Sequence, residues 1–174
     1  MTGLANLGSL VRDVEDFPTP GVLFKDITPL LADAGALAAA VAGLADPYAG
    51  AGVSAVVGVE ARGFILAAPV ALHLGAGFVP VRKAGKLPWK LEREEYALEY
   101  GTDLLEIHQD AVAPGERVLV VDDVLATGGT AEATVRLLER IGAEVVGLSF
   151  LIELAFLHGR TKLTDHEVTA LLTY

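Results

Sequence analysis

Two adjacent carboxylates precede a loop rich in glycine and threonine. Asp122 and Asp123 follow an apolar run at 117–121. The loop consists of Ala126, Thr127, Gly128, Gly129 and Thr130. Glycine adopts backbone angles closed to other residues, so consecutive amides can turn towards one anion. A helix after the loop would add unpaired N–H groups and the positive end of its dipole, and the segment therefore predicts a phosphate-binding loop.

The two acids need a separate explanation, because a carboxylate repels a phosphate group. Asp122 and Asp123 suit a ligand that also presents vicinal hydroxyl groups or carries a bridging metal ion, and a sugar phosphate has both features. The alternative is a turn and helix cap with two solvated acids. The combination of apolar strand, acid pair and glycine loop favours the functional interpretation. The loop pattern of many nucleoside triphosphatases, Gly-x-x-x-x-Gly-Lys-Ser/Thr, is absent from the sequence.

The same segment resembles the signature of the type I phosphoribosyltransferases, which is an apolar strand, two acids and a Thr-Gly-Gly-Thr-like loop. The resemblance implies that Asp122 and Asp123 contact the ribose 2′- and 3′-hydroxyls of phosphoribosyl pyrophosphate, and that the loop at 126–130 holds its 5-phosphate. It also implies Mg²⁺ as the cofactor. This ion would be held mainly through substrate and water near the two acids, without direct protein ligands.

Residues 17–27 resemble the base-binding hood of the adenine branch of this family. The resemblance implies that Phe24 stacks on the purine and that the backbone near Leu23 reads the base edge, with Lys25 also at the substrate. Stacking suits any flat heteroaromatic ring. The alternative for Phe24 is an ordinary core residue, and the flanking Pro-Thr-Pro-Gly sequence favours the base site.

Two further segments resemble the family's pyrophosphate site. Residues 58–64 are similar to a loop in which a non-proline cis peptide often occurs, so we expect Glu60–Ala61 to be cis and Arg62 to contact pyrophosphate or the base edge. The second segment supplies Arg82, Lys83 and Lys86. A cluster of cations in an acidic protein suggests an anion site, and the resemblance assigns Lys83 and Lys86 to pyrophosphate. The alternatives are a solvated arginine and a basic loop tip.

The polar stretch at 89–96 is interpreted as a mobile lid that ends at 97–101. The resemblance places Glu99 near the purine ring, where a shielded carboxylate can move a proton, and Tyr100 at the substrate. The alternative for Glu99 is a strand residue facing water.

The rest of the chain alternates between strand and helix patterns, which predicts an α/β fold. Apolar, β-branched runs indicate strands at 53–59, 78–82, 117–121, 144–152 and 168–172. Helices are expected at 6–15, 33–48, 63–74 and 130–141, and an extended segment at 22–27. Such alternation favours a mainly parallel sheet covered on both faces, with ligands beyond the carboxyl ends of its strands. The resemblance implies the same architecture: a mainly parallel twisted sheet flanked by helices, with a small N-terminal hood at about 1–33 and a mobile lid at about 83–101.

Bulk composition limits the class of protein. A chain of 174 residues, 52% hydrophobic and 21% charged, fits one domain over 1–174 with a substantial core. The net charge of −10 argues against nucleic acid as a partner. The most apolar stretches are too short or too interrupted to span a membrane, so we expect no membrane partner. No secretory signal is visible and cysteine is absent, so we expect a cytoplasmic protein. The four histidines show no metal-ligand spacing.

Taken together, the resemblance implies a purine salvage enzyme that transfers the 5-phosphoribosyl group from phosphoribosyl pyrophosphate to adenine, giving AMP and pyrophosphate. It also implies a homodimer, because the family is usually dimeric. One alternative is an enzyme of the same class that uses hypoxanthine, guanine, xanthine or orotate. Another is a non-catalytic sensor of phosphoribosyl pyrophosphate, although such regulators usually carry a nucleic-acid-binding element.

Overall fold

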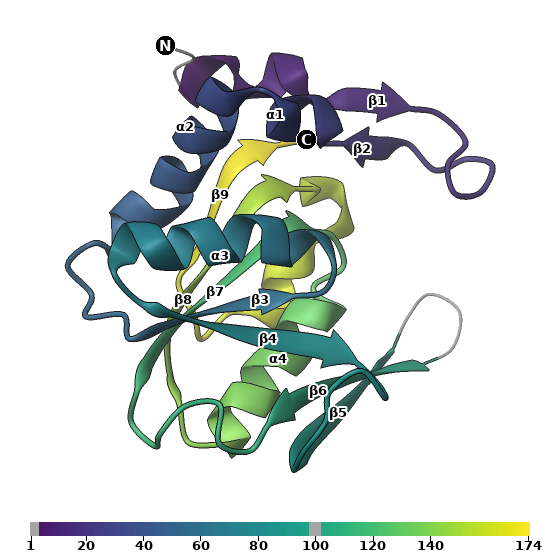
Figure 1. Ribbon diagram of the computed structural model, residues 1–174. Helices are drawn as coiled ribbons and strands as arrows, with labels where there is room; N and C mark the ends of the chain where they lie inside the picture. The colour runs from purple at the N-terminus through teal and green to yellow at the C-terminus, as the bar shows by residue number, and fades with distance from the viewer. Residues whose placement is uncertain (1–3, 98–101) are drawn as a thin grey trace.

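The centre of the molecule is a seven-stranded sheet in the order β5-β6-β4-β3-β7-β8-β9 (Figure 1). The structure is a computed structural model and describes residues 4–97 and 102–174. The strands are β3 (Ala55–Val59), β4 (Gly77–Lys83), β5 (Leu91–Ala97), β6 (Thr102–His108), β7 (Arg117–Leu125), β8 (Glu144–Glu153) and β9 (Val168–Thr173). From β4 to β9 each strand runs parallel to its neighbour, and β6 and β5 extend the edge as an antiparallel hairpin. The predicted mainly parallel sheet is confirmed.

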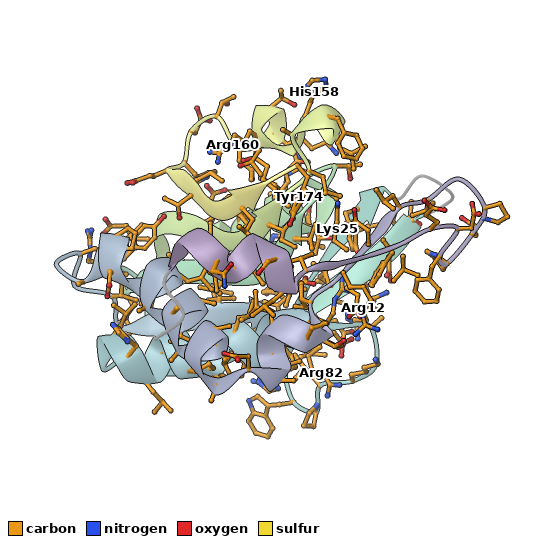
Figure 2. The ribbon with its side chains drawn as sticks, turned by 90° about the horizontal axis from the view of Figure 1, so that it is seen from above. Arg12, Lys25, Arg82, His158, Arg160 and Tyr174 are labelled. Carbon is orange, nitrogen blue, oxygen red and sulfur yellow. The ribbon has the colours of Figure 1, made fainter. Side chains whose placement is uncertain are left out.

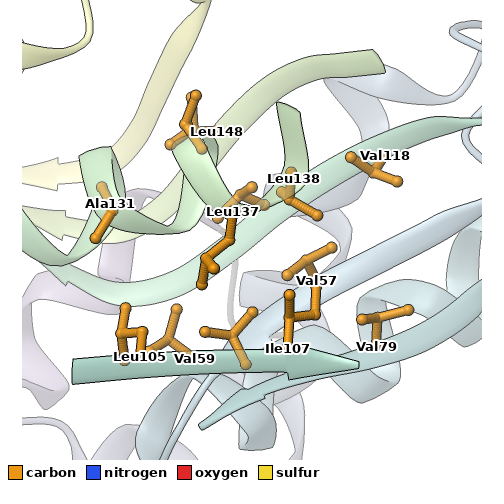
Figure 3. Packing of buried hydrophobic residues seen from close by; sticks show 14 of the residues in the cluster. Val57, Val59, Val79, Leu105, Ile107, Val118, Ala131, Leu137, Leu138 and Leu148 are labelled. Carbon is orange, nitrogen blue, oxygen red and sulfur yellow. The ribbon is translucent and has the colours of Figure 1, made fainter. Parts of the chain in front are cut away.

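Helices cover both faces of this sheet and create two apolar cores. On one face α4 (Gly129–Arg140) packs its buried side on alternate residues of β3 and β7. Figure 3 shows Leu137 and Leu138 of this helix above Val57 and Val59 of β3. On the other face α2 (Ala34–Ala45) and α3 (Arg62–Leu74) bury the remaining alternate residues, among them Val56 and Leu119. Burial on both sides explains why these strands are continuous apolar runs.

Short helical segments complete the chain. They are α1 (Thr28–Ala32) and the 3-10 turns η1 (Leu4–Leu10), η2 (Asp46–Tyr48), η3 (Ala155–Leu157) and η4 (Gly159–Lys162). The Asp33 side chain accepts a hydrogen bond from the Ala36 amide at 2.7 Å and caps α2, whereas Gly75 ends α3 with a φ of 68°. Among the helices in the described part of the chain, none has the length and apolar character needed to cross a membrane.

The N-terminal region differs from the prediction. The helix expected at 6–15 is absent, and the segment forms η1 followed by β1 (Arg12–Val14), which pairs antiparallel with β2 (Phe24–Asp26). Asp13 lies directly opposite Lys25 in this hairpin. The apolar spacing at 7–14 was compatible with a helix, but Leu7 alone is fully buried there, and cross-strand pairing takes over from Arg12.

The region predicted as a mobile lid also contains regular structure. Residues 89–96 were interpreted as a polar stretch between recognisable segments, yet β5 and β6 form a regular hairpin joined across 98–101. Glu92, Glu94 and Tyr96 are half-buried, and their neighbours Arg93 and Glu95 are exposed. The inward side of β5 thus carries carboxylates as well as Tyr96, and Glu94 pairs with Arg136 and Arg140 of α4. The β1–β2 and β5–β6 hairpins project from the same side of the molecule (Figure 1).

Candidate functional site

A large cavity lies at the carboxyl ends of the parallel strands, where α/β sheets bind ligands. Its volume is about 460 Å³. The walls come from the segment 22–25, the loop after β3, the ends of β4 and β5, and the end of β7. The lining residues are Val22, Leu23, Phe24, Lys25, Val59, Glu60, Ala61, Arg62, Lys83, Tyr96, Leu105, Asp122, Asp123, Val124, Ala126, Thr130 and Leu154. Segments that are far apart in the sequence, and were predicted separately, therefore share one cavity.

The acid pair lies at the floor of this cavity. The strand β7 extends to Leu125, four residues beyond its predicted end, so Asp122 and Asp123 belong to its carboxyl-terminal end rather than to a following loop. Arg62, at the start of α3, places Nε 2.6 Å from Oδ2 of Asp123. The angles do not make this contact a hydrogen bond, and this buried oxygen has no hydrogen-bond donor within 4–97 or 102–174. The site thus presents a carboxylate oxygen that can accept a hydroxyl.

Both carboxyl groups lie where the ionised form is unfavourable. Burial and the neighbouring Asp123 carboxylate raise the pKa of Asp122 well above its usual value. Burial also raises the pKa of Asp123, although the positive charge of Arg62 opposes the shift. A ligand that donates hydroxyl hydrogen bonds or brings a cation would favour the ionised forms of both groups.

The glycine loop forms a second, smaller cavity of about 60 Å³ beside the first. It is lined by residues 124–131 together with Asp122 and Phe150. Gly128 has a φ of 79°, and a Cβ on it would lie 2.4 Å from the carbonyl oxygen of Gly159. Only glycine fits this position, which lets the amides of the loop and the first turn of α4 surround an anion. The predicted phosphate loop therefore has the backbone conformation that such a site needs.

The opposite wall of the large cavity is aromatic. The Arg62 guanidinium carbon lies 5.0 Å from the centroid of the Phe24 ring, and Phe17 packs edge-on against the same ring at 5.1 Å. Leu23 is 48% exposed at the rim. Arg62 thus spans the space between the aromatic ring and the acid pair. Lys25 also lines the cavity, but its ammonium group lies 2.6 Å from Oδ1 of Asp13 on the neighbouring strand.

The basic cluster divides into two groups. Lys83 lines the cavity and pairs with Asp103 at 2.9 Å, and this partner raises the pKa of Lys83. Arg82 and Lys86 do not line the cavity and instead bind the Glu60 carboxylate, at 2.9 and 3.2 Å respectively. Burial works to raise the pKa of Glu60, but hydrogen bonds from the Lys83 amide and the Arg82 side chain outweigh it and bring the pKa below its usual value.

Two functional positions escaped the sequence interpretation. Glu60 holds the basic cluster together and also lines the cavity. Its place in the segment 58–64, which resembles the pyrophosphate loop, was the signal that could have identified it. Tyr96 lines the cavity from β5, donates to Asp103 at 3.3 Å, and has a pKa raised by burial.

The expected cis peptide at Glu60–Ala61 is present. Glu99 and Tyr100 lie outside the described residues.

No group of three or more histidine, aspartate or glutamate side chains able to hold a metal ion occurs within 4–97 or 102–174. The acid pair offers two carboxylates, and Oδ2 of Asp123 is ion-paired with Arg62. Two carboxylates fit an Mg²⁺ ion that keeps most of its coordination sphere for water and phosphate oxygens.

Comparisons with known proteins agree with this geometry. Residues 25–170 match the Phosphoribosyl transferase domain family. A curated adenine phosphoribosyltransferase from Thermobifida fusca is 62% identical over 163 residues, which cover 94% of this chain and 93% of the relative. A crystal structure of adenine phosphoribosyltransferase from Rhodothermus marinus shares 54% identity with a TM-score of 0.94, covering 98% of each chain. The enzyme from Saccharomyces cerevisiae, crystallised with adenine and an imino-altritol bisphosphate, has a TM-score of 0.91 at 38% identity and 97% coverage of each chain.

Proposed function

The chain belongs to the adenine phosphoribosyltransferase family, and we propose that its large cavity transfers the 5-phosphoribosyl group from phosphoribosyl pyrophosphate to adenine, giving AMP and pyrophosphate. This is a purine salvage reaction of the pentosyl transferase class. One observation carries the proposal. An acid pair, with Asp123 buried and ion-paired to Arg62, lies between a glycine-formed anion cradle and an aromatic ring.

The sugar half of the substrate is held by β7 and the loop that follows it. Asp122 and Asp123 accept hydrogen bonds from the ribose 2′- and 3′-hydroxyls, and the loop of Ala126, Thr127, Gly128, Gly129 and Thr130 surrounds the 5-phosphate. Bond breaking at C1′ gives the sugar the character of an oxocarbenium ion. Two carboxylates fixed beside this developing positive charge stabilise it without reorganisation, which lowers the barrier.

The base half lies under the hood formed by β1, β2 and the turn between them. Phe24 stacks on the adenine ring, the backbone at Leu23 and Lys25 reads the base edge, and Arg62 lies between base and sugar. Stacking and edge contacts hold the attacking nitrogen over C1′. This alignment lowers the entropic part of the activation barrier. A proton leaves the base during the reaction, and Glu99 in the lid accepts it. Unchanged turnover in Glu99→Gln would exclude that role.

The pyrophosphate leaves towards the cations of the wall. Lys83 and Arg62 reach it from the cavity, and Arg82, Lys86 and Tyr100 complete the substrate contacts when the lid closes. Asp122 and Asp123 would hold Mg²⁺ mainly through substrate and water, and the ion would supply positive charge to the phosphate oxygens. The lid at about 83–101 keeps water from the activated sugar, because hydrolysis is the wasteful competing reaction.

The enzyme works as a single domain over 1–174, with its hood at about 1–33, in the cytoplasm and as a homodimer. The absence of cysteine suits a reducing compartment. The exposed apolar residues of α3 provide a surface on which two copies can meet.

The decisive experiment is a base panel. Purified protein is incubated with phosphoribosyl pyrophosphate, Mg²⁺ and one of adenine, hypoxanthine, guanine, xanthine or orotate, and nucleotide formation is followed by chromatography. Adenine should be converted at least ~100-fold more efficiently than the others, because a site with fixed donors and acceptors rejects a base that leaves them unpaired. Preference for another base would reassign the substrate. Binding of phosphoribosyl pyrophosphate without turnover of any base would indicate a sensor.

A further inference from the structure

The Lys25 ammonium group makes its contacts inside the protein, whereas a residue that binds substrate would point its charge into the cavity. Lys25 is opposite Asp13 in the β1–β2 hairpin, and its Nζ lies 2.6 Å from Oδ1 of that residue. The same Nζ lies 3.9 Å from the centroid of the Tyr174 ring. Only 9% of the Lys25 side chain is exposed. Figure 2 shows Lys25 and Tyr174 next to each other at the base of the hairpin. The ammonium group therefore has two partners inside the protein.

Tyr174 in turn is fixed to the central sheet. Its amide donates to the carbonyl oxygen of Glu153 at 2.9 Å, and its own carbonyl oxygen accepts from the Ala155 amide at 2.9 Å. These bonds hold the residue after β9 against the end of β8. The contact between Lys25 and Tyr174 consequently joins the hairpin to a rigid part of the molecule.

The hairpin needs such a connection. It has two strands of three residues each, and a short two-stranded ribbon is marginally stable by itself. Its other charged pair, Arg12 with Asp26, has an N–O distance of 3.7 Å and an Arg12 side chain that is 64% exposed, so it contributes little. Phe24, which lines the cavity, precedes Lys25 directly. Any movement of Lys25 thus moves the aromatic ring of the base site.

We propose that Lys25, Asp13 and Tyr174 form an anchor that positions the hood over the base, and that the Lys25 side chain acts through Phe24 rather than by binding substrate. This inference rests on the proposed function, because it assigns the Phe24 side of the cavity to adenine. It also gives a role to the C-terminal segment, for which the sequence motifs offered none. Lys25 is a positioning residue, and its backbone remains part of the base site.

The two substrates distinguish an anchor from a direct contact. Adenine is neutral and lies under the hood, whereas phosphoribosyl pyrophosphate is strongly anionic. Loss of a direct Lys25 charge contact would therefore weaken the binding of phosphoribosyl pyrophosphate. Loss of the anchor would instead weaken the binding of adenine. Asp13 and Tyr174 do not line the cavity. An effect of changing either residue on the adenine KM must therefore pass through the hairpin.

The test compares Tyr174→Leu with Tyr174→Phe, and adds Asp13→Asn, in steady-state kinetics with each substrate varied. Tyr174→Leu removes the ring under the cation and should raise the adenine KM about 5- to 10-fold, the range expected for a shielded cation–π contact. Tyr174→Phe keeps a ring and should stay within about twofold of the unaltered protein. Asp13→Asn removes the charged partner of Lys25 and should also raise the adenine KM. The KM for phosphoribosyl pyrophosphate should stay constant in all three variants.

Hydrogen exchange provides a second measurement that does not depend on activity. The amides at 12–14 and 24–26 should exchange faster in Tyr174→Leu than in Tyr174→Phe, and the amides of β3 and β7 should be unaffected. An unchanged adenine KM in Tyr174→Leu, or a selective rise in the KM for phosphoribosyl pyrophosphate, would overturn the anchor. If the unaltered protein does not convert adenine, the proposed function fails, whereas exchange in the hairpin still tests the anchor.

Discussion

At the scale of single residues, the ionised forms of Asp122 and Asp123 are unfavourable in the ligand-free protein. The pKa values of Asp122 and Asp123 are both raised, mainly by burial. For a carboxyl group whose pKa is higher in the folded state, the unfolded chain releases its proton first. Folding stability from these groups is therefore intact below the unfolded value of about 3.9 and falls as pH rises through the folded pKa values. Ionisation of either carboxyl group therefore destabilises the ligand-free protein.

This predicts opposite effects of Asp122→Asn on stability and activity. A neutral amide at this position removes the cost of ionising a carboxyl beside Asp123, and it should raise the melting temperature by about 2–4 °C, the shift that ~1 kcal/mol produces in a domain of this size. The same change should lower kcat/KM for phosphoribosyl pyrophosphate roughly 10- to 100-fold, because a hydrogen bond to a charged acceptor is worth about 1.5–3 kcal/mol. Calorimetry and initial rates measure the two effects. A melting temperature that falls at pH 7 would contradict the electrostatic account.

Asp110→Asn serves as the control for this substitution. Asp110 is exposed in the turn after β6, so its replacement removes a charge without changing the acid pair. It should leave both the melting temperature and the kinetics unchanged. A gain in stability in this variant as well would indicate a general effect of the acidic net charge.

At the scale of elements, the phosphate loop depends on a close approach between two backbone segments. Gly128 packs against Gly159, which belongs to η4, and Leu154 donates to the carbonyl oxygen of Leu125 at 2.9 Å. The loop after β7 is therefore supported by the segment after β8. Its shape is set by packing between neighbours in the fold, as well as by its own glycines.

Gly128→Ala should consequently displace the loop. The added Cβ would lie 2.4 Å from the Gly159 carbonyl oxygen, so one backbone segment has to move. We expect at least a ~10-fold rise in the KM for phosphoribosyl pyrophosphate, with a smaller change for adenine. Gly115→Ala is a matched control, because Gly115 has a similar φ of 83° but a Cβ added there would meet no atom within 4 Å. It should lose about 1–2 kcal/mol of stability and keep normal kinetics. Equal kinetic defects in both variants would show that backbone strain, and not loop displacement, is responsible.

The hairpin of β5 and β6 adds a pH-dependent contact to the site. Asp103 of β6 accepts from Lys83 of β4 and from Tyr96 of β5, and Glu60 also faces this ammonium group. The hydrogen bond from Lys83 to Asp103 raises the pKa of Lys83, so the lysine keeps its charge to higher pH. In Asp103→Asn this support is lost. The alkaline limit of kcat/KM for phosphoribosyl pyrophosphate should then move to lower pH, as measured by a pH–rate profile. An unchanged alkaline limit would mean that Lys83 does not hold the leaving group.

How far the sequence predicted these elements depended on what each residue packs against. The strands β3, β7 and β8 were recognisable because they are apolar on both faces, as Val57 and Leu119 show. The strand β5 was missed because its inward side is polar: Glu94 is 13% exposed and pairs with Arg136 and Arg140 of α4. Nothing local shows that a glutamate will meet an arginine some forty residues away in sequence.

The site was predicted in a similar way. The residue types at the acid pair, the glycine loop and Phe24 were recognised from short motifs, and all of them line one of the two cavities. The arrangement of the cations was not. The Glu60 carboxylate binds the Lys86 ammonium group, which leaves Lys83 to face the substrate. This choice depends on how β4 and the loop after it place the two lysines around Glu60. Tertiary contacts, rather than local patterns, divide the basic cluster.

At the scale of the whole molecule, the sheet separates two cores and leaves one apolar helix face uncovered. The cavity at the carboxyl ends of the parallel strands is lined in part by residues of both hairpins, which project from the same side of the molecule (Figure 1). On α3, the helix that begins with Arg62, Ile65 is 46% exposed and Leu72 is 82% exposed. Residues seven apart share one side of a helix. Phe78, on the adjacent β4, is 37% exposed. Ile65 and Leu72 thus form an exposed apolar stripe on the helix that also supplies the central arginine of the site.

The proposed homodimer places this stripe at the contact between two copies. In a two-fold dimer the same surface meets itself, so a charge introduced on α3 is repeated across the interface and repels its equivalent. Leu72→Glu should therefore shift the protein from dimer to monomer in sedimentation velocity at micromolar concentration. Because Arg62 starts the same helix, the monomer should also lose part of its activity, and the loss should diminish as protein concentration rises. Phe156→Glu alters another exposed apolar residue, 66% exposed in η3 outside α3, and should leave the dimer intact. Dissociation by Phe156→Glu with a stable Leu72→Glu dimer would place the interface on the other side of the molecule.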